Sequence, residues 1–351
     1  MNLVILTLTC VAAMACSGHA SYSGSHSVQK NGAEELFAVQ KNGKVGFINR
    51  AGTVVIEPQF EPGQLRWGRY TRFSEGLAQI EEETSDTEPG VQLNSMKIGF
   101  IDWTGQVVIQ PQLVQSVYDF SEGLAAVGMN HRFGFIDKTG RVVIPLQWQS
   151  ARSFAEGLAT VGLDGKFGFI DKEGKVVIPL QFDSAMEFSE GLAKVNIQRK
   201  SVFIDKSGRV VLEPQVDDVR NFSDGLAAVS VNGKWGFIDK TGRMVIEPKY
   251  DAQDFSEGMA VVLVGGKSGY IDRSGDLVIK PKYSQAFKFS EGLARVEINK
   301  KWGYIDKTDR IVIKPQFYYA DDFRSGLAAV NTAEGYGYID KTAKYVWPPS
   351  K

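Results

Sequence analysis

Trp235-Gly236-Phe237-Ile238-Asp239 is the clearest copy of a five-residue pattern that recurs along the chain. The pattern is an aromatic residue, glycine, a second aromatic residue, isoleucine and aspartate. Nine copies align on central positions 46, 99, 134, 168, 202, 236, 269, 303 and 337. After the first interval the spacing is 33 to 35 residues. Self-similarity at such a period indicates a repeat architecture rather than a pair of unrelated domains.

A second motif, Phe-Ser-Glu-Gly-Leu-Ala, runs in fixed phase with the first. Its copies and close variants begin at Phe73, Phe120, Phe154, Phe188, Phe222, Phe255, Phe289 and Phe323. Together with a Val-Val-Ile-x-Pro stretch, the two motifs resemble the WG-repeat family over about residues 33–349. The aromatic residue before the glycine is often Phe or Tyr here, and Ser201-Val202 lacks both residues. The resemblance implies an exported or accessory bacterial protein and no particular activity.

Residues 226–258 show how one unit is expected to fold. Apolar, β-prone residues 226–231 precede Asn232-Gly233, which favours a type I′ hairpin turn because both residues accept positive φ. The second strand then covers residues 234–239. Asp239-Lys240-Thr241-Gly242 is typical of a type I turn leading into a third strand over residues 243–246. Each unit of about 34 residues is therefore predicted to be a three-stranded antiparallel meander followed by a connection.

The unit ends bear on how the units assemble. The first unit begins with its own first strand at residues 36–39, and the last unit ends with its third strand at residues 344–347. No split unit is left over to close a ring. An all-β, open, curved β-solenoid-like array is therefore predicted, and a closed β-propeller of eight or nine blades is the alternative. The strand glycine is expected to leave a gap that a neighbouring aromatic ring covers.

The N-terminus has the character of an export signal. Residues 3–15 are almost wholly apolar but too few to span a bilayer, which takes about 20 residues. We expect residues 1–20 to be a signal peptide. A lipoprotein signal ending at Cys16, simple cleavage after Ala20 and a buried N-terminal strand or helix all stay open. Residues 21–32 are expected to be a flexible tether and residues 33–351 the repeat array. The predicted location is outside the cytoplasm, as an envelope lipoprotein or a secreted or periplasmic protein.

Composition argues against several classes of site. The chain has 3 His, 2 Cys and a net charge of −1. No overall field draws it to nucleic acid, and no cofactor or metal is expected. Contact with a membrane is expected only through a possible lipid anchor at Cys16. His131 lies in a hairpin-turn position and is expected to be an exposed loop residue.

Three sets of repeated residues could suggest function but have structural explanations. The aspartates are expected to open turns rather than bind cations, the glutamates to form turns or a solvated rim rather than act as general acids, and the aromatics to pack between units rather than bind glycans. The aspartates are Asp102, Asp137, Asp171, Asp239, Asp272, Asp306 and Asp340; the glutamates are Glu75, Glu122, Glu156, Glu190, Glu257 and Glu291; the aromatics are Phe60, Trp148, Phe182, Tyr250, Tyr283 and Phe317.

An insertion near residues 61–97 is the most distinctive departure from the repeat. It combines a basic-aromatic stretch with an acidic stretch over residues 81–88, and the two could simply pair with each other. Insertions in repeat proteins often lie on the binding face. The candidate binding residues are Arg66, Trp67, Arg69, Tyr70 and Arg72. We therefore predict a non-enzymatic binding or scaffold module of the bacterial cell envelope, whose partner is an unknown envelope protein or cell-wall polymer. A propeller-type glycan-active enzyme and a passive spacer are the alternatives.

Overall fold

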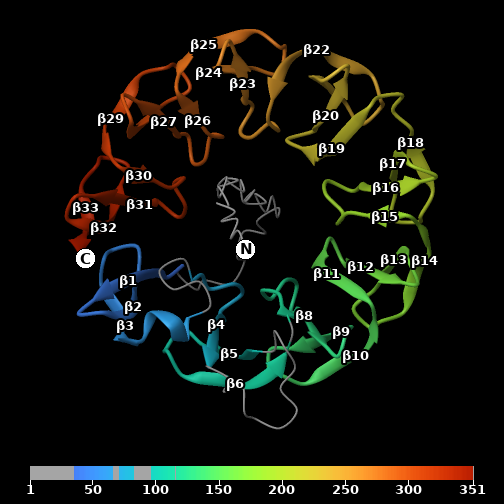
Figure 1. The fold of residues 1–351 in the computed structure, drawn as a ribbon, viewed down its shortest axis with the longest axis horizontal. Helices are drawn as coiled ribbons and strands as arrows, with labels where there is room; N and C mark the ends of the chain where they lie inside the picture. The colour runs from blue at the N-terminus through green and yellow to red at the C-terminus, as the bar shows by residue number, and fades with distance from the viewer. Residues whose placement is uncertain (1–34, 66–70, 83–95, 115, 351) are drawn as a thin grey trace, which may run out of the picture.

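The computed structural model describes residues 35–65, 71–82, 96–114 and 116–350. These residues form 33 strands and one 3-10 turn, η1 (Pro62–Gln64), so the predicted all-β class is confirmed. All strand pairs are antiparallel, and the sheets stand around a common centre (Figure 1). The predicted signal peptide, Cys16 and the tether lie outside the described residues.

The sheets correspond to the nine predicted units, which we call blades 1 to 9 in chain order. Blade 1 contains β1 (Phe37–Lys41), β2 (Lys44–Ile48) and β3 (Val54–Phe60), and blade 2 contains β4 (Ala78–Glu82), β5 (Met96–Ile101) and β6 (Val107–Val114). Blade 3 contains β7 (Ser116–Val117), β8 (Leu124–Met129), β9 (Arg132–Asp137) and β10 (Val142–Trp148), and blade 4 contains β11 (Ser150–Ala155), β12 (Leu158–Leu163), β13 (Lys166–Ile170) and β14 (Val176–Phe182). Blade 5 contains β15 (Ser184–Ala185), β16 (Ala193–Ile197), β17 (Lys200–Ile204) and β18 (Val210–Leu212).

Blades 6 to 9 continue the series around the ring. Blade 6 contains β19 (Asp218–Ser223), β20 (Leu226–Val231), β21 (Lys234–Ile238) and β22 (Met244–Ala252), and blade 7 contains β23 (Ala260–Val264), β24 (Lys267–Ile271) and β25 (Leu277–Tyr283). Blade 8 contains β26 (Gln285–Ala286), β27 (Ala294–Ile298), β28 (Lys301–Ile305) and β29 (Ile311–Phe317). Blade 9 contains β30 (Tyr319–Ala320), β31 (Leu327–Thr332), β32 (Gly335–Asp340) and β33 (Tyr345–Ser350). The end of β22 pairs with β23, so one strand serves two blades.

Most blades have one strand more than the sequence predicted. The connection between units contains a short strand at the inner edge of the next sheet, as where Ser184 and Ala185 of β15 pair with Asn196 and Val195. Within a blade the strands then run from the centre of the ring to its rim, as β11 to β14 do (Figure 1). Two paired residues carry too little periodicity to be recognised in sequence.

The predicted turns are present. Asn232 and Gly233 have φ values of 51° and 74°, as a type I′ hairpin requires. In the next turn the Gly242 amide donates to the Asp239 carbonyl at 2.9 Å, and the Asp239 amide donates to the Arg243 carbonyl at 3.0 Å. Each unit thus follows the strand and turn order read from residues 226–258.

The strand glycine is required for a different reason from the one expected. A Cβ atom built on Gly236 would lie 2.4 Å from the carbonyl oxygen of Ile246 and 2.6 Å from the nitrogen of Pro248. The same backbone approach recurs at Gly46, Gly99, Gly134, Gly168, Gly269, Gly303 and Gly337. The glycine is therefore needed because the kinked outer strand passes directly against it. The expectation that an aromatic ring fills the gap is corrected.

Blade 5 shows what happens without this glycine. Val202 takes its place, and the outer strand β18 shrinks to Val210–Leu212. Only Phe203 and Ile204 pair with that strand, whereas in blade 6 a third pair, Trp235 with Tyr250, extends the ladder. The valine side chain is buried and occupies the space that the outer strand uses elsewhere.

The hydrophobic core lies mainly between neighbouring blades. At each of eight joints an aromatic ring of one blade packs on the motif phenylalanine of the next, with centroids 4.7 to 5.1 Å apart. Five of the six aromatics after the third strand are buried, as predicted, and Phe60 is partly buried. Blade 9 also packs on blade 1, through a cluster that includes Phe37, Val39 and Leu327. The array therefore curves back on itself as a nine-bladed β-propeller, which was the closed alternative.

Candidate functional site

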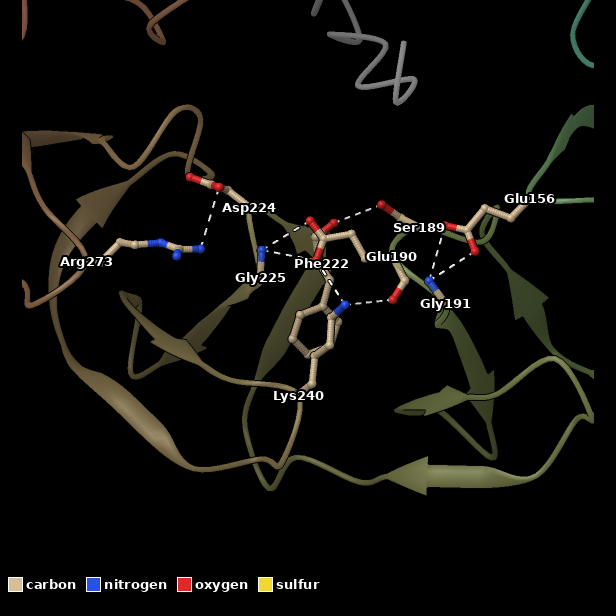
Figure 2. A network of polar contacts seen from close by, with 9 residues as sticks. All are labelled: Glu156, Ser189, Glu190, Gly191, Phe222, Asp224, Gly225, Lys240 and Arg273. Atoms are coloured by element: carbon tan, nitrogen blue, oxygen red, sulfur yellow. Dashed lines mark hydrogen bonds and ion pairs between the residues drawn. The ribbon is translucent and has the colours of Figure 1, made fainter. Parts of the chain in front are cut away.

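The Ser-Glu-Gly turns join each blade to the next through a network of polar contacts. Figure 2 draws residues from three successive joints, of which the joint between blades 5 and 6 is the most complete. At one of them the Glu190 carboxylate accepts from the Gly225 amide at 3.0 and 3.1 Å and forms an ion pair with Lys240 at 3.2 Å. The Lys240 ammonium also donates to the Glu190 carbonyl, and the Ser189 hydroxyl donates to the Phe222 carbonyl at 3.0 Å.

This network recurs at seven consecutive joints, from blade 2 to blade 9, and we call it the turn belt. In every case an acidic side chain accepts from a glycine amide and meets a cation of the following blade. The acid, glycine and cation are Glu75, Gly123 and Lys138; Glu122, Gly157 and Lys172; Glu156, Gly191 and Lys206; Glu190, Gly225 and Lys240; Asp224, Gly258 and Arg273; Glu257, Gly292 and Lys307; Glu291, Gly326 and Lys341.

The belt explains why the glutamate recurs. Each acidic residue has positive φ, such as 54° at Glu190, and so does the glycine after it. The turn directs the carboxylate across the joint, where it satisfies an amide that would otherwise lack a partner. The expectation of a turn role is confirmed. The expectation of a merely solvated rim is too weak, because these side chains connect blades.

The repeated aspartates occupy the first position of the turn before each outer strand, also as expected. Asp306 accepts from the amides of Thr308 and Arg310 and from the Thr308 hydroxyl. The Thr308 hydroxyl, above all, lowers the pKa of Asp306 to about 2. The Ser207 hydroxyl does the same for Asp205. A low pKa keeps these carboxylates ionised as hydrogen-bond acceptors, which is poorly suited to proton donation.

A second set of cross-blade contacts lies on the innermost strands. Arg220 donates to the Ala252 carbonyl at 3.1 Å and lies 3.9 Å from the Trp235 ring. Two blades further on, Arg295 reaches the corresponding carbonyl of Ala320 from a different strand. It also pairs with Asp322 at 2.9 Å. Burial raises the pKa of Asp322, even though Arg295 favours its charged form. Both arginines reach the equivalent carbonyl of the next blade, so we assign them a structural role.

The joint between blade 9 and blade 1, which we call the seam, is built differently. Phe37 stands where every other unit has alanine, and its ring packs against Tyr338 with centroids 5.4 Å apart. Arg324 stands at the serine position of the motif and pairs with Glu35 at 2.5 Å. Aromatic packing and one ion pair thus replace the usual contacts there.

The turn belt itself is interrupted at the seam. Ser325 stands at the acidic position, Glu35 at the glycine position and Arg50 at the lysine position. The Arg50 guanidinium lies over Gly326, within 2.7 Å of where a Cβ would be. Among the described residues it has no carboxylate partner, and it is exposed. The seam therefore retains the cation of the belt but lacks the acid.

The predicted binding residues fall in two groups. Arg66, Trp67, Arg69 and Tyr70 lie outside the described residues. Arg72 is described and exposed, and its backbone forms a bridge with Phe37 beside the seam.

The insertion is not one continuous loop. One part separates Leu65 from Thr71 at the inner edge of blade 2, where Leu65 bridges to Ile80. The other part lies within the hairpin of β4 and β5, between the paired residues Glu82 and Lys97. Leu65 with Thr71 and Glu82 with Lys97 are therefore two separate places at which the described part of blade 2 flanks the insertion.

Phe37, Arg50 and Ser325 were not singled out from the sequence. Each is a departure from the repeat, so comparing the units position by position contained the signal. What was missing was the ring closure that brings the first and last units together. His131 is exposed in its hairpin turn, at a φ of 59°, as expected.

The described ranges contain neither a metal-binding cluster nor a membrane-spanning helix. No group of three or more His, Cys, Asp or Glu residues there is placed to hold a metal ion. In the same part of the chain, no helix is long and apolar enough to cross a membrane.

Comparison with protein families agrees with the repeat geometry. The model of the WG containing repeat matches residues 46–61, 98–130, 133–167, 167–200, 203–235, 235–267, 269–302 and 302–333. The chain belongs to the WG-repeat family. The matched segments follow the blades around the ring, and the predicted resemblance is confirmed. No curated protein matches the chain.

One solved structure has the same fold at low sequence identity, and two others are similar to the chain to a lesser degree. A structure described as the eukaryotic initiation factor has a TM-score of 0.60 and 11% identity, covering 89% of this chain and 95% of its own. The dihydro-heme d1 dehydrogenase NirN has a TM-score of 0.46 and 15% identity, covering 90% and 73%. The computationally designed Ika8 protein has a TM-score of 0.44 and 11% identity, covering 79% and 94%. The first of these structures supports the propeller fold and indicates nothing about function.

Proposed function

We propose that this WG-repeat propeller is a non-enzymatic binding or scaffold module of the bacterial cell envelope. Its partner would be an envelope protein or a cell-wall polymer. The observation that carries the proposal is the seam, where several departures from the repeat collect on one part of the ring. Arg50, Arg72 and Ser325 lie there. Unrepeated polar residues on a rigid scaffold are what a specific binding site requires.

The repeated acidic residues support a binding role over catalysis. General acid–base chemistry needs carboxylates whose environments differ at one locus. The belt acids, six glutamates and one aspartate, instead share one environment and are engaged by amides and cations across seven joints. The turn aspartates are likewise held by their own turns. These carboxylates stabilise the ring, so the proposal assigns them no chemical step.

The envelope location rests on the sequence of the N-terminus. An apolar run followed by Cys16 favours export with lipidation of that cysteine. Growth of producing bacteria with an alkyne-bearing palmitate should label the wild-type chain and leave Cys16→Ala unlabelled. Export without labelling of either chain would favour simple secretion, and retention of both in the cytoplasm would contradict the proposal.

A cross-linking capture from cell-envelope extract tests the binding role. The baits are the full chain and two variants, one with residues 66–70 deleted and one with residues 83–95 replaced by a two-residue Asn-Gly turn. Both variants retain Leu65 and β4, which belong to the blade. Specific capture lost only in the first variant would place the partner beside the seam. Absence of any specific capture by folded baits would contradict the binding proposal.

A further inference from the structure

The seam resembles a belt joint from which the acid has been removed. At the seven regular joints a carboxylate lies between a main-chain amide and a cation, as Glu291 does between Gly326 and Lys341. At the seam, Arg50 supplies the cation and the main chain of Glu35 stands at the glycine position. The turn has kept its shape, because Ser325 and Gly326 have φ values of 45° and 85°, close to the 53° and 84° of Glu291 and Gly292.

The side chain of Ser325 is too short to reach across the joint to the next blade. A glutamate at the same position carries its carboxylate two carbons further, which is how it reaches the next blade elsewhere. The serine hydroxyl can still donate a hydrogen bond. The seam therefore retains donors of the kind that hold a carboxylate, and Arg50 is exposed to solvent.

The charge around the seam also favours an anion. Arg50, Arg72 and Arg324 lie around it, and two acids are close by: Glu35, which is paired with Arg324, and Asp321, which also acts on Arg324. The pKa of Arg324 is lowered first by burial and next by the positive charge of Arg72, so these two cations are close enough to interact. An incoming carboxylate would relieve this repulsion, and guanidinium groups bind carboxylates with favourable geometry.

We infer that the seam is a carboxylate-binding slot, and that its ligand is a glutamate side chain of a partner protein. A peptide source is favoured because the acid that fills the equivalent space at most joints is a peptide-borne glutamate. The inference rests on the proposed binding function and adds the chemical class that the module recognises. It assigns the site to Arg50 and Ser325, with Arg72 at its border.

The test uses the full chain and short synthetic probes. Ligand-observed NMR titrations would compare acetyl-Gly-Glu-Gly-amide with acetyl-Gly-Gln-Gly-amide and with free glucuronate. The glutamate peptide should bind about tenfold more tightly than the glutamine peptide, as expected for loss of a charged hydrogen bond. Equal binding of the two peptides would overturn the inference. Tighter binding of glucuronate would overturn the peptide source in favour of an acidic glycan.

Two variants and a control locate the effect. Arg50→Gln should lose the preference for glutamate. Ser325→Glu should also lose it, because its own carboxylate fills the slot, and its melting temperature should rise. Arg141→Gln, which removes an exposed arginine on another blade, should bind as the wild type does. Unchanged binding by Arg50→Gln and Ser325→Glu would refute the site.

The capture from cell-envelope extract distinguishes failure of this inference from failure of the proposed binding function. Partner capture that survives Ser325→Glu, together with no peptide binding, would refute the slot and leave the binding function standing. Loss of capture in Ser325→Glu but not in Arg141→Gln would support both. Peptide binding without any envelope capture would support the slot and contradict the proposed function.

Discussion

Phe37 packs against Tyr338 with ring centroids 5.4 Å apart, and this pair connects the first blade to the last. At the other joints the equivalent ring partner is the phenylalanine of the Ser-Glu-Gly motif, such as Phe188 against Phe169. Blade 1 supplies its ring from the strand itself, at a position where all other units have alanine. At the seam, phenylalanine in place of the repeated alanine thus supplies the ring that the motif phenylalanine supplies at other joints.

Phe37→Ala should therefore weaken the seam selectively. Phe37 is 2% exposed, and truncation of a buried phenylalanine lowers the free energy of unfolding by about 3–5 kcal/mol. Urea-induced unfolding would measure the loss. Hydrogen exchange should accelerate in β1–β3 and β30–β33 first. The matched control is Phe188→Ala, which should affect blades 4 and 5 instead. Identical exchange patterns for the two variants would contradict a distinct seam.

Much of this fold could be predicted from the sequence because its signals are local. The Asn232-Gly233 and Asp239-to-Gly242 turns need residues that tolerate particular backbone angles, so residue type alone identifies them. The buried aromatics after each third strand follow from periodic burial. The unit boundaries and the all-β class depend on nothing beyond these patterns.

The closure and the seam could not be predicted in the same way. Closure depends on the small rotation from one blade to the next, which no single unit encodes. The unit ends suggested an open array, because propellers are often closed by a strand from the opposite terminus. Here Phe37 and the Arg324–Glu35 pair connect complete terminal units instead. The role of the strand glycine was also hidden, since it depends on the path of the outer strand.

Gly236→Val should detach the outer strand of blade 6. The new side chain would overlap the Ile246 carbonyl and the Pro248 nitrogen, which approach a Cβ at 2.4 and 2.6 Å. Overpacking of this kind costs about 1–3 kcal/mol. The exchange of amides paired between Trp235 and Tyr250 should become faster. Blade 5 already has this arrangement through Val202, so exchange in blade 5 of the same variant is the control and should stay unchanged. Intact pairing in Gly236→Val would contradict the explanation.

Glu190→Ala should weaken the joint between blades 5 and 6. It removes the acceptor of the Gly225 amide and the ion-pair partner of Lys240. An amide left without its partner costs about 1–3 kcal/mol when buried, and this joint is partly exposed, so the lower end is expected. Glu190→Gln keeps an acceptor oxygen and should cost less. The order of urea midpoints, wild type above Gln above Ala, checks this. Equal midpoints for the two variants would mean that the amide contact contributes little.

The turn aspartates should make the stability of the ring depend on acid pH. The pKa of Asp205 and of Asp306 is lowered from 3.8 to about 2 by hydrogen bonds present only in the folded chain. A group whose folded pKa is depressed stabilises the fold above its unfolded pKa and loses this effect as the pH falls through the folded pKa. Melting temperatures should therefore fall between about pH 4 and pH 2, the window these two values define.

The double variant Asp205→Asn, Asp306→Asn tests this assignment. Asparagine can close the same turn, because Asn49 in blade 1 accepts from the amides of Ala51 and Thr53 at 3.1 and 2.9 Å. The variant should fold into the same ring and show a shallower decline between pH 4 and pH 2. Both curves would be measured by thermal unfolding at constant ionic strength. Parallel curves would show that other carboxylates dominate acid unfolding, and the belt acids, which lie between cations and amides, would be the next to substitute.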